Sequence, residues 1–197
     1  MRNICLDLKK IDCSQMRPII SNKMGQYYHP VILDATGKIV VWMEAHAYDN
    51  GYKLMEHSYL GNNFVSTFEY GLSPNGIYHM SSVVWAGDYA EPEPGQEKNL
   101  HHLCNEYNLI RPTEKTTTSC RFVVNHSKKL FVDKWKIPNV NNLFIHPLPL
   151  LTVEGNGLGG GDYRGDSKLV GSWARDIISV EYNAPDGFQE LVFDLIV

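Results

Sequence analysis

A glycine-rich segment near the carboxyl end of the sequence offers the clearest setting for ligand chemistry. Six of the twelve residues 155–166 are glycine, and glycine allows positive φ angles and a close approach of the backbone to another group. The segment matches neither the dinucleotide-binding fingerprint nor a P-loop, so a series of tight turns that only connects two elements is the alternative. A carboxylate, an aromatic ring and a guanidinium follow one another inside it. The residues that we expect to contact a ligand here are Gly160, Gly161, Asp162, Tyr163 and Arg164.

A second group of candidates follows a strand that the sequence predicts at residues 81–86. Trp85 stands near the end of this strand, and Gly87 then allows a turn that exposes Asp88 and Tyr89. Loops at strand ends are common positions for ligand contacts. We therefore expect Trp85, Asp88 and Tyr89 to contact a ligand, and the alternative is an acidic turn that only ends the strand.

A polar stripe on a helix predicted over residues 52–70 forms the third group. Its members recur at spacings of four, three and four residues and share one face of a helix; they are Tyr52, Glu56, Tyr59 and Asn63. We expect Tyr52 to contact the ligand. His57 lies on the apolar side of the same helix. The alternatives are a solvated surface for the stripe and a buried, hydrogen-bonded position for His57.

Other catalytic chemistries have no motif in this sequence. His101 and His102 are adjacent, and adjacent side chains on a helix diverge by about 100°, so they make a poor metal pair. The sequence contains neither an H-x3-H pair nor a G-x-S-x-G nucleophile elbow. The four cysteines have no C-x2-C spacing and are too sparse for a disulfide framework. We expect reduced thiols, no metal site and no cofactor.

Composition and charge limit the class of protein. Hydrophobic residues make up 43% and charged residues 20% of the 197 residues, which is typical of a folded globular chain. A net charge of -4 gives no general attraction to nucleic acid or to anionic lipid. Apolar runs are too short for a membrane span, and charged residues interrupt the first twenty positions, so we expect neither a signal peptide nor a membrane partner and a cytoplasmic location.

The elements that must position these residues alternate between strand and helix patterns. Hairpins are predicted from residues 27–34 with 39–48 and from 119–124 with 130–136, and further strands at 176–182 and 189–196. The helix over 52–70 contains Gly61, which predicts a break or kink, and a short helix is predicted at 99–107. Residues 91–95 are expected to form an exposed acidic loop with two prolines, and residues 144–154 an edge strand or an extended segment. The fold class is α+β, with a mainly antiparallel sheet and one longer and one short helix.

The sequence pattern indicates a single domain over residues 1–197. Residues 1–23 have mixed polarity and weak periodicity, and the sharper pattern of strands and helices begins after Met24. We therefore expect residues 24–197 to form the core and residues 1–23 to form an N-terminal arm.

Four stretches carry a resemblance to other proteins: residues 24–28 (MGQYY), 53–58 (KLMEHS), 84–91 (VWAGDYAE) and 159–163 (GGGDY). Together they resemble an uncharacterised group of proteins carried by bacteria and their phages. The resemblance spans about residues 24–165 and implies no established activity or catalytic residue. It implies a phage-linked context, in which capture of a small signalling molecule or interaction with a host protein is plausible.

The three groups of candidate residues together predict a protein that binds a small polar or nucleotide-like ligand. In this hypothesis an aromatic ring stacks on the ligand and Arg164 holds an anionic group. One alternative is a hydrolase that activates water by acid-base chemistry; its candidate catalytic residues are Glu56, His57, Asp88 and Asp162. A second alternative is a protein–protein antagonist of a host factor that uses exposed aromatic residues and the acidic loop around Glu91 and Glu93.

Overall fold

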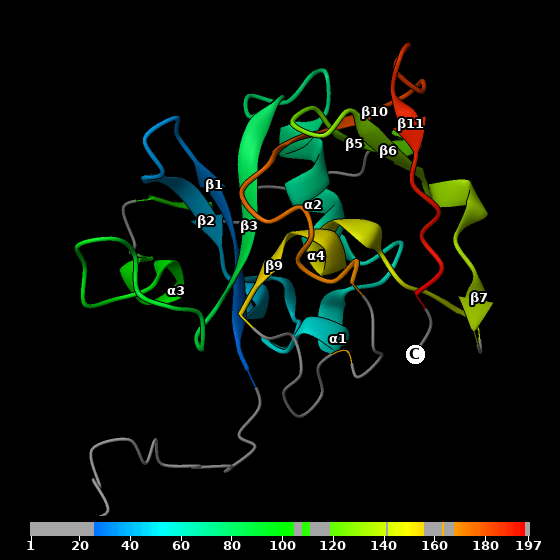
Figure 1. Cartoon of the computed structure of the whole chain (residues 1–197). Helices are drawn as coiled ribbons and strands as arrows, with labels where there is room; N and C mark the ends of the chain where they lie inside the picture. Colours follow the sequence, from blue (N-terminus) through cyan, green and yellow to red (C-terminus); the bar gives the residue numbers. More distant parts are fainter. Residues whose placement is uncertain are drawn as a thin grey trace, which may run out of the picture.

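The computed structural model describes residues 26–104, 108–110, 119–140, 142–155, 163 and 168–195. Within these ranges the chain forms a mixed, mostly antiparallel sheet with helices against it, which confirms the predicted α+β class (Figure 1). Along the sheet the strands follow the order β11-β6-β5-β10-β3-β1-β2-β4, and β9 pairs with β3 outside this path. Three of the pairings are parallel: β2 with β4, β3 with β9, and β6 with β11.

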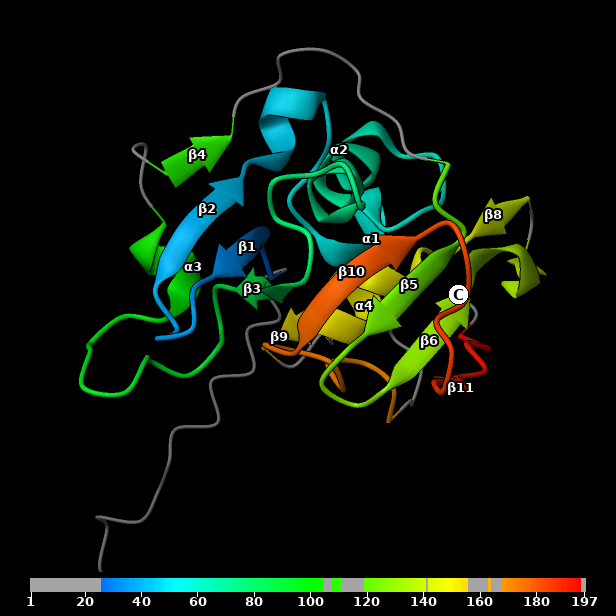
Figure 2. The ribbon, with the colours of Figure 1, turned by 90° about the horizontal axis from the view of Figure 1, so that it is seen from above.

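The strands of the main sheet are β1 (Tyr28–Leu33), β2 (Ile39–Met43), β3 (Ser81–Gly87), β4 (Leu109–Ile110), β5 (Phe122–Asn125), β6 (Leu130–Asp133), β9 (Val153–Glu154), β10 (Ile177–Glu181) and β11 (Gln189–Glu190). A separate small hairpin consists of β7 (Asn139–Val140) and β8 (Leu143–Phe144). The helices are α1 (Leu54–His57), α2 (Asn63–Leu72), α3 (Leu100–Leu103) and α4 (Pro147–Thr152), with short 3-10 turns η2 (Ala45–Tyr48) and η4 (Lys134–Lys136). Figure 2 shows the curved sheet from above.

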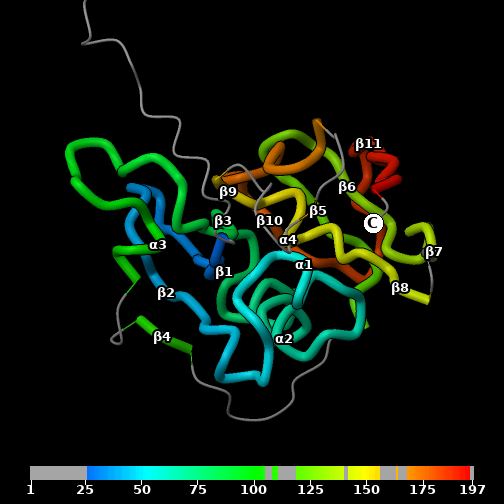
Figure 3. Tube along the Cα trace, turned by 90° about the horizontal axis from the view of Figure 1, so that it is seen from below, coloured from blue at the N-terminus to red at the C-terminus, as the bar shows by residue number. Residues whose placement is uncertain are grey.

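The two faces of the sheet are covered differently. Successive side chains of a strand point to opposite faces, and in β1 the residues Tyr28 and Ile32 join the larger core with α1, α2 and α4. Val31 and Leu33 of the same strand point to the other face, into a smaller core with Leu100 of α3. Figure 3 shows α3 beside β1 and β2, apart from α1, α2 and α4.

Most predicted elements are present in the structure. Two hairpins lie where the sequence predicts them, β1 with β2 and β5 with β6, and so do strands β3 and β10. The predicted strand at 39–48 is shorter than expected, because η2 forms its last residues. The predicted break at Gly61 is confirmed: this residue has a φ of +84° and separates α1 from α2. Residues 189–190 pair with β6 in parallel, and only these two residues of the predicted strand 189–196 are in strand conformation among those described.

The prediction of an edge strand or extended segment at residues 144–154 is wrong, because most of this segment forms α4. Pro147 is tolerated at the first helical position, where its missing N–H would have no partner in the helix. His146 caps the helix, since its Nδ1 accepts a hydrogen bond from the backbone N–H of Leu148 at 3.1 Å. All six residues of α4 are buried, so tertiary packing outweighs the two prolines.

Candidate functional site

Residues 88–99, here called the strap, leave the end of β3 and lead into α3. The start of the strap is fixed to the chain that precedes β1: Asp88 donates its backbone N–H to the carbonyl of Tyr27 at 3.0 Å, and its Oδ1 accepts from the N–H of Tyr27 at 3.1 Å. The end is fixed by Asn99, whose Nδ2 donates to the carbonyls of Asp88 and Ala90 at 3.0 and 2.9 Å. Between these points lie two prolines that have no N–H to donate.

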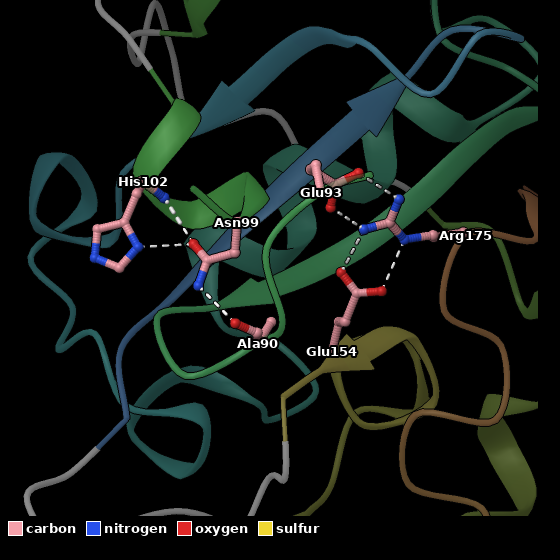
Figure 4. A network of polar contacts seen from close by, with 6 residues as sticks. All are labelled: Ala90, Glu93, Asn99, His102, Glu154 and Arg175. Atoms are coloured by element: carbon pink, nitrogen blue, oxygen red, sulfur yellow. Dashed lines mark hydrogen bonds and ion pairs between the residues drawn. The ribbon is translucent and has the colours of Figure 1, made fainter. Parts of the chain in front are cut away.

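Asn99 also caps α3. Its Oδ1 accepts a hydrogen bond from the backbone N–H of His102 at 3.1 Å, and the Nδ1 of His102 lies 2.8 Å from the same oxygen (Figure 4). An asparagine at this position satisfies backbone groups that a helix start leaves free. One buried side chain therefore joins the strap to the helix that follows it.

Arg175 forms the electrostatic centre of the site, with Glu154 on one edge of its guanidinium and Glu93 on the other (Figure 4). Its Nε and Nη2 donate to Glu154 at 2.7 and 2.8 Å. Its Nη1 donates to Glu93 at 2.9 Å, and Nη2 makes a second bond to the same carboxylate. The hydrogen bonds that the guanidinium donates to Glu154, and then those to Glu93, raise the pKa of Arg175 above its usual value. The guanidinium is thus a fixed cation that holds two carboxylates.

The backbone of Arg175 is held against β3. Its N–H donates to the carbonyl of Val83 at 2.7 Å, and its own carbonyl accepts from the hydroxyl of Ser82 at 2.8 Å. The residue adopts a φ of 66°, a left-handed conformation that side chains other than glycine rarely take. Backbone strain of this kind persists where surrounding contacts fix it and is common at functional sites.

Two hollows flank the strap. The Tyr89 hollow has a volume of about 620 Å³ and is lined by Tyr89, Glu91, Glu154 and Gly155, among others. The Lys38 hollow, about 510 Å³, lies between the strap and the turn after β1; its lining includes Thr36, Lys38, Ile39, Gln96 and Leu100. Both hollows are bordered by Glu93, Pro94 and Arg175. The ion pair between Glu93 and Arg175 therefore stands between them.

A cluster of aromatic and imidazole rings lies where the chain enters β1. His29 stacks on His101 of α3 with ring centroids 4.3 Å apart and planes within 8°. Tyr52 makes edge-to-face contacts with His29, Tyr27 and His46. The hydroxyl of Tyr52 donates to Glu44 at 2.6 Å, and burial together with this carboxylate raises the pKa of Tyr52 to about 12.

The ring nitrogens of the stacked histidine pair are poorly paired. Nδ1 of His29 and both nitrogens of His101 are buried without a hydrogen-bond partner among the described residues. Burial, followed by the charges of His101 and His57, lowers the pKa of His29 to about 3. Parallel rings direct their lone pairs into parallel planes, so this pair cannot chelate one metal ion in the observed geometry.

The structure places the predicted residues of the strand-end group in different surroundings. Tyr89 is 51% exposed and lines the Tyr89 hollow, and Asp88 is half-buried at the start of the strap. Trp85, in contrast, is fully buried, and its indole N–H donates to Nε2 of His57 at 2.9 Å. Its ring therefore packs in the larger core and has no open face for a ligand.

The candidates on the helix stripe and in the glycine-rich segment are also dispersed. Nδ1 of His57 lies 3.0 Å from the carbonyl of Gly51, so both of its nitrogens have partners, and burial lowers its pKa to about 4. Glu56 is exposed and accepts from the N–H of Lys53 at 3.0 Å, which caps its own helix. Tyr163 is buried in the larger core. The remaining candidates lie outside the described residues: Gly160, Gly161, Asp162 and Arg164.

Sequence reasoning missed Glu154 and Arg175, and it considered Glu93 only as part of an exposed acidic loop that could contact a host protein. Glu154 ends an apolar run, and Arg175 follows a tryptophan and an alanine, so neither has a motif around it. Their positions in the site depend on β9 pairing with β3 and on the backbone contacts of Arg175 with the same strand. The prolines and glycine of the strap were the only local signal of an unusual segment.

Comparisons of the chain with protein-family models, with curated proteins and with solved structures found no match. Among the residues that the structure describes, no helix is long and apolar enough to cross a membrane. Within the same residues, no three histidine, cysteine, aspartate or glutamate side chains gather as they would around a metal ion.

Proposed function

We propose that this protein binds a small polar molecule in the Tyr89 hollow. The observation that carries the proposal is a concave space of about 620 Å³ in which an exposed tyrosine ring lies near charged groups that are fixed by ion pairs. Small-molecule sites have volumes of about 300–1,000 Å³ and combine aromatic surface with a few well-placed polar groups. The hollow meets both conditions.

Tyr89 supplies the contact surface. A tyrosine ring offers a flat apolar face at a low cost in conformational entropy, and its hydroxyl can donate or accept a hydrogen bond. This is the stacking role that a nucleotide-like or sugar-like ligand needs. Gly155, which begins the glycine-rich segment, also lines the hollow.

The acid–base alternative finds less support in the geometry. General acid–base catalysis requires a titratable group within reach of substrate, but both nitrogens of His57 are engaged inside the core and Glu56 caps its own helix. Neither side chain lines the two hollows that flank the strap. The third described candidate, Asp88, does not line these hollows either.

A thermal-shift screen with matched tyrosine variants tests the proposal. Nucleotides, cyclic nucleotides, ADP-ribose derivatives, sugars and small carboxylic acids such as succinate are the compounds to screen. A ligand at a hundred times its dissociation constant stabilises the folded state by about 2.7 kcal/mol, which raises the melting temperature by roughly 5–10 °C in a domain of this size. We expect Tyr89→Ala to reduce that shift. Tyr182→Ala is the control, because Tyr182 is exposed to a similar degree, 46% against 51%, and does not line either strap hollow.

Two outcomes would contradict the proposal. One is a wild-type protein whose melting temperature no compound raises. The other is a hit that stabilises the Tyr89→Ala and Tyr182→Ala variants equally, because the site would then lie elsewhere in the chain.

A further inference from the structure

The two carboxylates on Arg175 are held in different ways. Glu154 belongs to β9 and lies beside Ala86 of β3 in the register of the sheet, so strand pairing fixes its backbone. Glu93 belongs to the strap, where residues 91–98 are exposed except for Glu93 itself. The backbone N–H of Glu93 donates to Lys98 at 3.0 Å and its carbonyl accepts from Gln96 at 2.8 Å, so these bonds stay within the strap. No strand pairing holds the backbone of Glu93, so it is the carboxylate that can move away from Arg175, although its side chain is less exposed than that of Glu154, 13% against 27%.

Departure of Glu93 would change the shape of the site. The Tyr89 hollow and the Lys38 hollow meet at Glu93, Pro94 and Arg175. If the Glu93 side chain moves away, the two hollows join into one groove. The edge of the guanidinium formed by Nη1 and Nη2, which now holds Glu93, then faces this groove.

The chemistry of the freed guanidinium edge selects one class of ligand. Arginine binds carboxylates through two parallel hydrogen bonds, and this is the geometry in which Glu93 is held. A ligand carboxylate in the same place leaves the net charge around Arg175 unchanged. A phosphate dianion would instead add a second negative charge beside Glu154, and a cation would approach a guanidinium.

We propose that Glu93 occupies the position of a ligand carboxylate on Arg175, so that the strap is an autoinhibitory contact and the ligands of this site are small carboxylic acids. This inference rests on the proposed function, because it concerns the same site and names its ligand class. The ligand exchanges with an internal side chain, and its apparent affinity is reduced by the fraction of molecules in which the strap is closed.

Calorimetric titration of succinate into the wild type and Glu93→Gln tests the exchange. Glutamine keeps the shape of the side chain but loses the charge that holds the strap closed. We expect succinate to bind Glu93→Gln more tightly than the wild type by roughly threefold to fivefold, as expected if between about one in three and one in five wild-type molecules is open. Glu190→Gln is the control, since Glu190 is an ion-paired glutamate on another part of the surface, with Lys136 as its partner. Its affinity for succinate should equal that of the wild type.

Further probes define the ligand chemistry. Succinamide, a neutral analogue of succinate, should not bind, and inorganic phosphate should bind Glu93→Gln less tightly than succinate does. Arg175→Lys keeps the positive charge but loses the two-pronged hydrogen bonding of the guanidinium, and it should abolish succinate binding. Thermal denaturation without ligand shows whether each variant is folded. If Arg175→Lys is unfolded, the titration of Glu93→Gln alone tests whether a ligand carboxylate exchanges with Glu93.

Different results would refute the autoinhibitory contact and the proposed binding function. If compounds bind in the screen in a Tyr89-dependent manner but Glu93→Gln leaves succinate affinity unchanged or lowers it, the autoinhibitory contact is refuted and the binding function stands. Absence of succinate binding to both proteins, or tighter binding of phosphate than of succinate, also refutes the carboxylate assignment. A screen without any hit refutes the proposed function itself.

Discussion

Charged residues are used in opposite ways in two regions of this protein. In the larger core, Glu69 of α2 lies 2.7 Å from Nζ of Lys134 and 3.1 Å from Nε2 of His146, and all three side chains are at most 10% exposed. At the strap, the side chain of Arg175 is 34% exposed and lies between two hollows. The buried cluster joins α2 to η4 and to the start of α4, whereas the strap cluster joins a surface segment to the sheet. We therefore expect the buried charges to maintain the fold, whereas the proposed ligand exchange involves the charges at the strap.

The protonation of the buried cluster follows from its contacts. Burial on its own would raise the pKa of Glu69, but the contacts with His146 and Lys134 outweigh it and hold the pKa below its usual value. Burial lowers the pKa of His146, and its Nδ1 accepts a hydrogen bond from Leu148, so the ring is neutral with its proton on Nε2, facing Glu69. Lys134 is then the cation that balances Glu69 in the described part of the core.

The largest expected loss of stability comes from breaking the buried ion pair between Glu69 and Lys134. Glu69→Gln should lower the free energy of unfolding by about 3–5 kcal/mol, because it leaves the ammonium of Lys134 buried without its counter-charge. Urea denaturation at neutral pH measures the loss. The double variant Glu69→Leu with Lys134→Met should recover most of it, since removing both charges leaves neither unpaired. A loss below about 1 kcal/mol for Glu69→Gln would show that solvent reaches the cluster.

An intermediate change in the free energy of unfolding is expected at acidic pH. It comes from His29, which stacks on His101 between β1 and α3. The pKa of His29 is about 3 in the folded protein and 6.5 when unfolded, so the unfolded state binds more protons in acid. Stability is therefore highest above pH 6.5 and falls as the pH drops toward 3; at pH 5 the loss from His29 is about 2 kcal/mol. His57, with a pKa of about 4, contributes in the same direction.

His29→Phe isolates the contribution of the stacked pair. Phenylalanine keeps a flat ring against His101 but cannot take up a proton, so the variant should lose about 2 kcal/mol less than the wild type between pH 7.5 and pH 5. Urea denaturation at the two pH values measures the difference. Equal losses in both proteins would mean that His29 is hydrated in the folded state.

The smallest expected change in the free energy of unfolding comes from a substitution in the strap. Glu93→Gln should change the free energy of unfolding by less than about 1 kcal/mol, because its partner Arg175 is one-third exposed and keeps Glu154. The same urea experiment, run beside Glu190→Gln, measures it. A loss as large as that of Glu69→Gln would mean that the strap is part of the core, and the contrast between the two regions would disappear.

Local sequence patterns were sufficient to predict much of the fold. Alternating β-branched and aromatic residues indicated the hairpin of β1 and β2 and the hairpin of β5 and β6, and Gly61 indicated the break between α1 and α2. The same reasoning failed for α4, because the two prolines that argue against a regular strand are acceptable in the first turn of a buried helix. It also failed for Trp85, whose position near a strand end does not show on which face of the sheet its ring lies.

The sequence by itself determined the α+β class, the strand pairs that are close in the chain, and an unusual proline-rich segment ahead of α3. Only the tertiary structure decided which residues come together at the candidate site. Arg175 is separated by 82 residues from Glu93 and by 21 from Glu154, and it meets both because β9 and the backbone of Arg175 are held against β3. Periodicity and turn chemistry report on neighbours in the chain, whereas these contacts depend on sheet register, which no local pattern in this chain specifies.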